Sequence, residues 1–306
     1  MSTGQRLLVI SPMRNEAEHL ERVVFAMAAQ TRPADLWLIV DDCSTDATGR
    51  VLETLAQHVS FMEVLGAPPS LAEGTKDRLA AAAAPRAFNH GLHAVDWRSF
   101  THIAKLDGDT ELPPRYFELL LRRFEEDPGL GLAGGVRIER VGRRELLERV
   151  PTAHHVPGAL KCYTLNCFEA IGGMPERLAW DTIDEVYARM RGFRTRAFPD
   201  LVAIHHRPWG SADGRLRGRA RHGRCAYIAC YPPAWAVLRA AKTAGSRPWG
   251  LSGLAYLWGY LAAAARGTAR VDDPEFRRFF RRELRGRARA AIPGPGSLRP
   301  IVRHGA

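Results

Sequence analysis

The chain has 306 residues, of which 46% are hydrophobic and 25% are charged. This composition excludes an intrinsically disordered chain and is sufficient for a sizeable core. The net charge of +11 favours anionic partners, but 40 of the 44 basic residues are arginine, which is typical of a GC-rich genome, so the charge carries little weight.

The cysteines and the first residues indicate the cellular compartment. Five scattered cysteines form no C-x-x-C pair, which argues against a zinc site and against a disulfide framework. Residues 1–6 lead directly into an apolar strand, with no signal peptide before it. We therefore expect a reducing, cytoplasmic setting.

Apolar strands alternate with amphipathic helices through the first 110 residues. In the first helix, Leu20, Val23, Val24 and Met27 share one face. This order predicts right-handed crossovers and a parallel sheet covered on both faces. The expected strands are residues 6–11, 36–40, 61–65 and 101–106, and the expected helices are 16–30, 47–58 and 77–96.

The second half of the chain is less regular. It predicts helices at 113–127 and 181–191, strands at 130–139 and 196–206, and a strand or loop within 158–174. After about residue 210 the composition shifts to Arg, Gly and Ala. The uncharged run at 250–265 is shorter than the roughly 20 residues that span a bilayer, so we expect a buried or interfacial helix there.

Three polar clusters follow strands in the first half. They are Met13–Glu16, Asp41–Asp46 and Asp107–Asp109. In a parallel sheet, ligands bind beyond the carboxyl ends of the strands. The clusters therefore predict one shared site at one edge of the sheet.

The pair Asp107 and Asp109 has the spacing of a metal site. Side chains at i and i+2 of an extended chain point the same way, so both carboxylates can face one cation. Gly108 between them permits a tight turn. Hard oxygen ligands suit Mg²⁺ or Mn²⁺, which bridge carboxylates to substrate phosphates. The alternative is an acidic turn after a strand.

With these motifs in order, the chain resembles an A-type glycosyltransferase of family two over about residues 5–210. The resemblance rests on Val9–Glu16, Val40–Asp46, Asn89–Gly91, Leu106–Asp109, Gly158 to Gly173, and Trp180–Glu185. It implies a Rossmann-like, mostly parallel central sheet with helices on both faces, the A-type glycosyltransferase fold, and a C-terminal helical extension.

The family binds a nucleotide-sugar donor. The resemblance implies that the first loop, with Pro12, Arg14, Asn15 and Glu16, holds the base and ribose together with Asp42. A carboxylate such as Asp42 can accept from the imide N–H of uracil, and its alternative role is that of a turn residue. Contacts to the donor are also expected from Arg86, whose alternative is a solvated helix face, from Gly158 beside the donor sugar, and from Lys161, which can neutralise phosphate or lie at the surface.

The metal site extends the resemblance. Asp109 is expected to bind Mn²⁺ or Mg²⁺ directly, and Asp107 to hold the ribose or a metal-bound water. Such an ion offsets the charge that develops on the departing diphosphate. His205 is expected as a third ligand or phosphate contact, in preference to His206, and its alternative is a hydrogen-bonded rim histidine.

An inverting enzyme also needs a base for the acceptor hydroxyl. The candidates are Asp181, which we favour slightly, and Asp184, three residues apart at a helix start. The family usually has adjacent Glu and Asp here, so the assignment stays open, and one of the two serves as a helix cap. Trp180 could stack on an acceptor sugar or pack.

The resemblance predicts the organisation of the chain and its activity. Residues 1–210 form the catalytic domain, with a nucleotide-binding half to about 110 and an acceptor half from about 111, and residues 211–306 form a basic, mostly helical extension. The function is metal-dependent, inverting transfer of a sugar from a nucleotide-diphosphate sugar to a glycan or lipid-linked acceptor in cell-surface polysaccharide synthesis. We expect a cytoplasmic protein at the inner face of the plasma membrane, with peripheral membrane contact through residues 232–266.

Three alternative functions are compatible with parts of the sequence. A polyprenyl phosphate acceptor is already ionised and needs no base. A basic nucleic-acid-binding protein is suggested by the arginines of 215–224. However, no aromatic side chains interleave with these arginines, and the sequence shows no motif of a known nucleic-acid-binding fold. A catalytically inactive scaffold is disfavoured by the intact pair Asp107 and Asp109.

Overall fold

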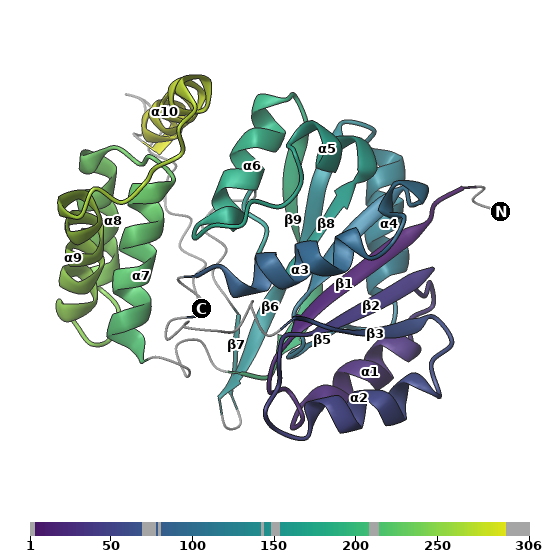
Figure 1. The fold of residues 1–306 in the computed structure, drawn as a ribbon. Coiled ribbons are helices and arrows are strands. Elements are labelled where there is room, and N and C mark those ends of the chain that lie inside the picture. Colours follow the sequence, from purple (N-terminus) through teal and green to yellow (C-terminus); the bar gives the residue numbers. More distant parts are fainter. Residues whose placement is uncertain are drawn as a thin grey trace, which may run out of the picture.

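A mixed sheet of nine strands organises the described part of the chain (Figure 1). The computed structural model describes residues 4–68, 78, 81–141, 144–147, 154–207 and 214–291, with the backbone alone at 139–147 and 290–291. The strand order is β3-β2-β1-β4-β8-β6-β9-β5, with β7 paired to β6. Six of these strands run in one direction, since only β5, β7 and β8 oppose their neighbours. The predicted α/β fold with a mostly parallel sheet is confirmed.

The first half follows the predicted alternation of strands and helices. Each of the four core positions predicted for the first helix is buried. The amide of Thr48, the first residue of the second helix, donates to Asp46 Oδ1 over 2.9 Å, although the N-cap position itself is Ala47. The elements are β1 (Leu7–Met13), α1 (Leu20–Ala28), β2 (Leu36–Asp41), α2 (Thr48–Ala56), β3 (Met62–Gly66), α3 (Ala83–His93), η2 (Trp97–Ser99) and β4 (His102–Leu106).

One predicted helix is shorter than expected. The described helix α3 begins at Ala83, whereas the pattern predicted a helix from residue 77. Ala82 before it adopts a left-handed backbone, and Pro85 lies in its first turn, where proline is tolerated. Residues 77, 79 and 80 lie outside the described part, so that start of the prediction is untested.

The second half completes the sheet and begins a helical bundle. Its elements are β5 (Thr110–Glu111), α4 (Tyr116–Glu126), β6 (Leu130–Val141), β7 (Arg144–Leu147), β8 (Leu160–Thr164), α5 (Leu165–Ala170), α6 (Trp180–Met190), β9 (Arg194–His205), α7 (Arg215–Ile228), α8 (Pro233–Ala244), α9 (Leu251–Ala265) and α10 (Pro274–Ala291). The segment 158–174, which was predicted to contain a strand or a loop, contains the strand β8 followed by the short helix α5.

Helices cover both faces of the sheet, as predicted. One apolar cluster joins α1, α2 and α4 to one face, with Trp37 fully buried at its centre. The other joins α3, α5 and α6 to the opposite face around Phe88 and Phe168. Because the central strands are buried on both faces, they read as continuous apolar runs instead of alternating ones.

The helices α7 to α10 lie beside the sheet as a separate layer (Figure 1). A third apolar cluster joins them to α6 through Ile183 and Val186. Helices α7 and α9 pack closely because glycines face backbone: a Cβ at Gly223 would lie 1.9 Å from the Tyr256 carbonyl oxygen, and one at Gly259 would lie 1.8 Å from that of Ala220. The predicted boundary at 210 falls outside the described residues. Within the described part, none of the helices has the length and apolar character needed to cross a membrane.

Candidate active site

The ends of β1, β2 and β4 bring the three predicted polar clusters together. Met13 pairs with Asp41 in the parallel register of β1 and β2, and β4 lies on the other side of β1. The amide of Asp42 donates to the Met13 carbonyl over 2.8 Å, and the amide of Asn15 donates to Ser44 Oγ over 3.0 Å. The loops after the strands therefore form one polar rim, as expected for parallel neighbours.

Asp42 is buried at this rim with one carboxylate oxygen unsatisfied. Its Oδ2 pairs with the guanidinium of Arg78, and its carbonyl accepts from Arg14 Nη1 over 2.6 Å. Its Oδ1 is buried and finds no hydrogen-bond partner in the described part of the chain. A buried carboxylate oxygen without a donor costs free energy, so this atom suits a ligand that brings an N–H.

Asp107 is the more exposed member of the acidic pair. Its side chain is 34% exposed, and its Oδ1 pairs with the ammonium of Lys105, whose own side chain is 1% exposed. Lys105 Nζ also donates to the Gly158 carbonyl over 3.2 Å. Lys105 thus holds Asp107 in place from beneath, a role that the sequence analysis missed. The available signal was a lysine within an otherwise apolar strand.

Asp109 is buried and faces His205. Its Oδ2 lies 3.2 Å from His205 Nε2, while His206 turns to Glu111, 2.8 Å away. Burial by itself would raise the pKa of Asp109, but the hydrogen bond and charge of His205, with Arg207 beyond, hold it below its ordinary value. The structure therefore places His205, and not His206, against the acidic pair.

Glu16 adds a third carboxylate to this rim. Burial, followed by the negative charge of Asp109, raises the pKa of Glu16 to about 8, although Arg207 pairs with it at 2.9 Å. A Cβ at Gly108 would lie 3.1 Å from Glu16 Cγ, so glycine allows this close approach. We call Glu16, Asp107, Asp109 and His205 the acidic cluster.

The acidic cluster fits a divalent cation that is completed by substrate. Among the described residues, no three His, Cys, Asp or Glu side chains form a ready-made metal site. However, adjacent ligands of an octahedron with bonds of about 2.1 Å lie about 3.0 Å apart, close to the 3.2 Å between Asp109 Oδ2 and His205 Nε2. Magnesium-type sites commonly use one or two protein ligands plus substrate phosphates and water, so the donor set fits.

Trp180 and Asp181 begin α6 beside the acidic cluster. The Trp180 ring lies 5.2 Å from Lys105 Nζ and 5.4 Å from Lys161 Nζ, and a Cβ at Gly158 would lie 3.2 Å from this ring. Trp180 thus packs over Gly158 and two ammonium groups, and it links the acidic cluster to α6. Of Asp181, the backbone carbonyl accepts from Lys161 over 2.6 Å, but no described residue bonds its carboxylate.

Asp184 and Lys161 do not occupy the positions expected of a base and a phosphate contact. Both side chains are fully buried, with Lys161 Nζ 2.8 Å from each carboxylate oxygen of Asp184. Tyr163 Oη donates to Asp184 over 2.5 Å, and the Glu185 amide donates over 2.6 Å. Asp184 is therefore saturated by protein donors, and Lys161 is neither at the surface nor free for a phosphate. Lys161 and Asp184 are partners of each other inside the second half of the chain, a pairing that their spacing in the sequence did not show.

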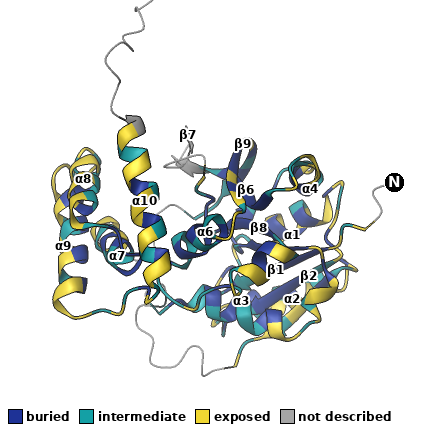
Figure 2. Cartoon of the chain, turned by 90° about the horizontal axis from the view of Figure 1, so that it is seen from above, coloured by how far each residue is buried: buried dark blue, intermediate teal, exposed yellow. Residues whose placement is uncertain are grey.

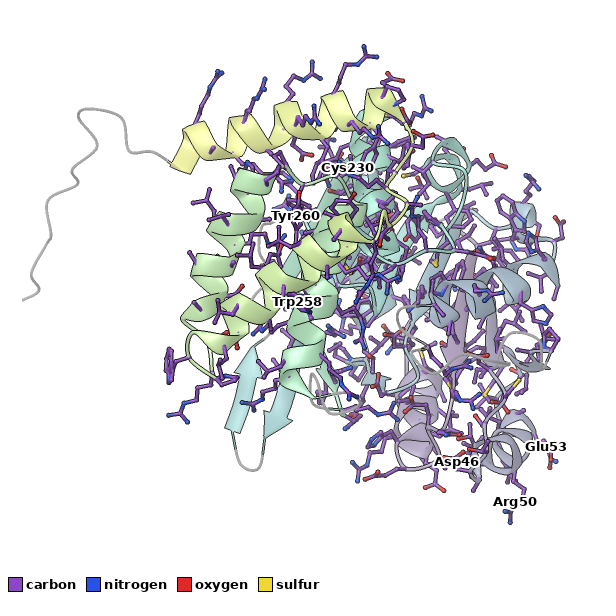
Figure 3. The ribbon with its side chains drawn as sticks, turned by 60° about the vertical axis from the view of Figure 1, so that its left-hand side comes forward. Asp46, Arg50, Glu53, Cys230, Trp258 and Tyr260 are labelled. Carbon is purple, nitrogen blue, oxygen red and sulfur yellow. The ribbon has the colours of Figure 1, made fainter. Side chains whose placement is uncertain are left out.

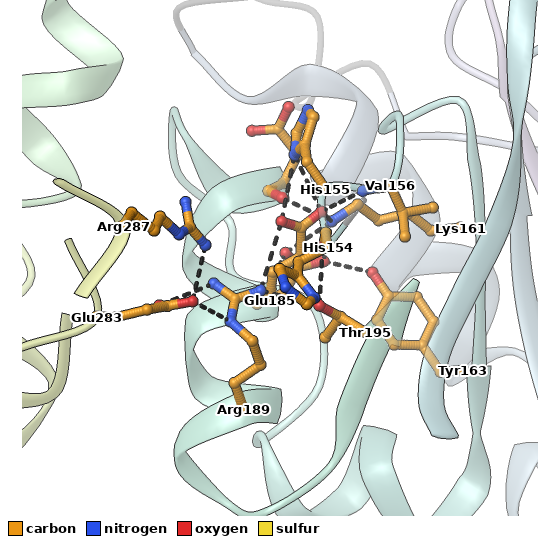
Figure 4. Close-up of polar contacts among 12 residues, drawn as sticks. His154, His155, Val156, Lys161, Tyr163, Glu185, Arg189, Thr195, Glu283 and Arg287 are labelled. Atoms are coloured by element: carbon orange, nitrogen blue, oxygen red, sulfur yellow. Dashed lines mark hydrogen bonds and ion pairs between the residues drawn. The ribbon is translucent and has the colours of Figure 1, made fainter. Parts of the chain in front are cut away.

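A buried ion network surrounds this pair (Figure 4). We define it as His155, Lys161, Tyr163, Asp184 and Glu185. Glu185 accepts from the Val156 amide over 2.8 Å and lies 3.1 Å from His155 Nδ1. Burial opposes a charge on Lys161, yet the two carboxylates raise its pKa above the ordinary value, and burial likewise opposes the Glu185 charge, yet Lys161 lowers its pKa to about 2. Each charge in the network has its counter-charge.

Arg86 lies apart from the rim. It is on α3, and its guanidinium is 4.0 Å from the carboxylate of Glu176. Among the described residues, no contact joins it to Asp42 or Asp107, so the structure does not bring it to the expected donor site. Arg207 takes a place that the sequence did not predict, since it lies just after β9 and bonds both the Asn15 carbonyl and Glu16.

A cavity of about 280 Å³ lies elsewhere, between α3 and α5. It is lined by residues including His93, Trp97, Phe168 and Gly173. These residues are near the start of β4, at the opposite end of the strand from Asp107. The cavity is therefore separate from the rim at the strand ends.

A known protein family matches the first half of the chain. The model of the family described as "Glycosyl transferase family 2" matches residues 8–150, which include β1 to β4 and the pair Asp107 and Asp109. Residues 8–150 are a family 2 glycosyltransferase domain. The protein is therefore a glycosyltransferase. No curated protein matches the chain.

Solved structures of glycosyltransferases share this fold. The mannosyltransferase PcManGT from Pyrobaculum calidifontis, in complex with GDP-Man and Mn²⁺, is 20% identical with a TM-score of 0.54, over 95% of this chain and 82% of that one. S. aureus TarS 1–349 in complex with UDP-GlcNAc is 14% identical with a TM-score of 0.54, over 88% of this chain and 74% of that one. At these identities the likeness establishes the A-type fold alone.

Proposed function

We propose that this glycosyltransferase is inverting and metal-dependent. It moves a sugar from a nucleotide-diphosphate sugar to a glycan or lipid-linked acceptor in cell-surface polysaccharide synthesis, at the inner face of the plasma membrane. The observation that carries the proposal is that the rim holds the unsatisfied Asp42 oxygen and the acidic cluster, beside an Asp181 carboxylate on α6 that no described residue bonds. The family 2 match and the nucleotide sugars bound in two similar solved structures agree with it.

The donor is expected to occupy the first half of the rim. Asp42 accepts an N–H from the base through its free Oδ1, and the loop from Pro12 to Glu16 contacts the base and ribose. Asp107, held by Lys105, accepts from a ribose hydroxyl or a metal-bound water. Asp109 and His205 would hold Mn²⁺ or Mg²⁺, which when bound stabilises the negative charge of the leaving diphosphate.

The acceptor is expected to meet Asp181. As the acceptor hydroxyl attacks the anomeric carbon from the face opposite the diphosphate, Asp181 removes its proton. Asp181 suits this role because its carboxylate has no bond to a described residue, whereas Asp184 is saturated. Trp180 and Gly158 shape the wall between donor and acceptor. In this scheme residues 1–110 bind the donor, residues 111–210 bind the acceptor, and residues 211–306 are an extension.

A panel of nucleotide sugars, each with Mn²⁺, Mg²⁺ or EDTA, tests the proposal by thermal shift and by donor hydrolysis. One donor class should raise the Tm with a divalent ion and lose most of this effect in EDTA, because a ligand that binds only the folded state stabilises it. NMR of the product should show inversion at the anomeric carbon.

The variant Asp109→Asn should lose the metal-dependent shift. Glu111→Gln, two residues away and paired with His206, is the matched control and should keep it. A donor-induced shift that is equal in EDTA, or equal in Asp109→Asn, would contradict metal dependence.

A further inference from the structure

Large apolar side chains are exposed on one part of the helical bundle. Of the ten large hydrophobic residues that are exposed in the described part of the chain, seven lie between residues 237 and 261. We call these seven the apolar face; they are Val237 and Leu238 on α8, Trp249 before α9, and Leu251, Leu254, Trp258 and Leu261 on α9. Exposed apolar patches of this kind mark binding surfaces on soluble proteins.

The four members on α9 form one stripe. Their spacing of three, four and three residues places them on one side of the helix, with exposed fractions from 52% to 67%. Tyr256 and Tyr260 belong to the buried side, where Tyr260 Oη donates to the Tyr231 carbonyl over 2.8 Å (Figure 3). The outer sides of α8 and α9 are exposed in Figure 2.

Helix α9 is therefore apolar on both sides, although only one is covered. Residues 251–265 contain no charged side chain. A helix that is hydrophobic all round is ordinarily buried, and an exposed helix ordinarily carries polar residues on its outer face. The outer face of α9 has the composition of a surface that contacts an apolar medium.

The segment of the chain that carries the apolar face has charge of one sign. Residues 214–271 contain ten Arg and Lys and no Asp or Glu. Lys242, Arg247 and Arg266 are exposed beside the face, at the ends of α8 and α9. Two copies of the chain that met through this surface would bring these like charges together, whereas an anionic bilayer would attract them.

We propose that the apolar face docks on an anionic lipid bilayer. Trp249, Trp258 and the leucines of α9 enter the interface between headgroups and acyl chains, and Lys242, Arg247 and Arg266 contact the anionic headgroups. The bundle packs on α6 through Ile183 and Val186, and Asp181 lies in the first turn of that helix. Docking therefore fixes the site relative to the bilayer. The surface is assigned independently of the reaction, so its test does not depend on the proposed function.

Flotation of the full chain with vesicles tests the proposal. The chain should float with vesicles of phosphatidylcholine and phosphatidylglycerol, and far less with phosphatidylcholine alone. The double variant Leu254→Ser and Trp258→Ser should reduce partitioning at least about tenfold, since each loses buried apolar area. Phe25→Ser is the matched control, because Phe25 is 64% exposed but lies on α1, and it should float as the unsubstituted chain does.

The basic residues are tested in the same assay. Lys242→Gln with Arg247→Gln should weaken binding about fivefold for each charge and reduce its dependence on salt. Arg22→Gln with Arg50→Gln is the matched control, since both residues are exposed on α1 and α2, and Arg50 lies at the other end of the molecule from Trp258 (Figure 3).

Each other result overturns the proposal. A chain that stays in the bottom fraction with anionic vesicles would exclude docking on the bilayer. Variants of the apolar face that float as well as the unsubstituted chain would exclude it too. A dimer in light scattering that the double variant Leu254→Ser and Trp258→Ser converts to monomer would assign the apolar face to a second copy. The Tm of each variant is measured in parallel and should be unchanged, because all substituted side chains are exposed.

Discussion

The acidic cluster and the buried ion network lie on either side of Trp180, but they treat charge in opposite ways. In the network, Lys161 faces two carboxylates, and Asp184 receives three hydrogen-bond donors. In the acidic cluster, Glu16, Asp107 and Asp109 each have one basic partner, yet burial with the Asp109 charge raises the pKa of Glu16 to about 8. Buried charge that is saturated by protein donors is closed to a ligand and costly to disrupt, whereas carboxylates that crowd one another at a rim are candidates for binding one. Asp184 is saturated by protein donors. Asp109 lies among crowded carboxylates, and the carboxylate of Asp181 has no bond to a described residue.

Breaking the network should have the largest effect on stability. Lys161→Met leaves the buried carboxylate of Asp184 without its cation, so the free energy of unfolding should fall by about 5 kcal/mol. Chemical denaturation measures the change, with Lys242→Met at an exposed position as the control. A loss under about 1 kcal/mol would mean that the network does not stabilise the fold, contrary to its burial.

The two aspartates of α6 offer the sharpest contrast. Asp181→Asn should lower kcat about 10³-fold, equivalent to about 4 kcal/mol, and leave the Tm unchanged, because it removes a base that contacts no described donor. Asp184→Asn should instead lower the Tm. Steady-state kinetics and thermal unfolding of both variants measure kcat and the Tm and so distinguish the two roles. If Asp181→Asn keeps full activity, the acceptor is already ionised, as a polyprenyl phosphate is, or the base lies elsewhere.

A third buried titratable group serves as a reference for both regions. His102, at the other end of β4 from Asp107, is buried against Phe124, and burial lowers its pKa from 6.5 to about 4, with only a partial opposing effect from Glu125. Because the pKa of His102 is lower in the folded state, its contribution to the free energy of unfolding is fully present above about pH 6.5. This contribution decreases by about 3 kcal/mol as the pH falls to about 4.

Urea denaturation across this range, for the unsubstituted chain and for His102→Leu, measures that contribution. The difference between the two should vary with pH only below about 6.5. His58→Leu is the matched substitution at an exposed histidine. A difference that is constant across the range would show that His102 titrates equally in both states.

Much of the fold was readable in the sequence. The runs at β1, β2 and β4 are apolar because both faces of these strands are buried, and the period of Leu20, Val23, Val24 and Met27 gave the face of α1. Polar clusters that follow parallel strands must meet at one edge, so the assembly of Met13–Glu16, Asp41–Asp46 and Asp107–Asp109 was predictable from strand order.

Only the tertiary structure decided which charges are free. Asp181 and Asp184 stand three residues apart on one helix, and His205 and His206 are adjacent, so spacing could not separate either pair. Lys161 on β8 selects Asp184, and Asp109 selects His205, through contacts between residues 23 and 96 positions apart. The same holds for α9, whose uncharged run was evident from sequence although its exposed side was not. Pairing and exposure depend on which surfaces meet in three dimensions, and local sequence does not encode that.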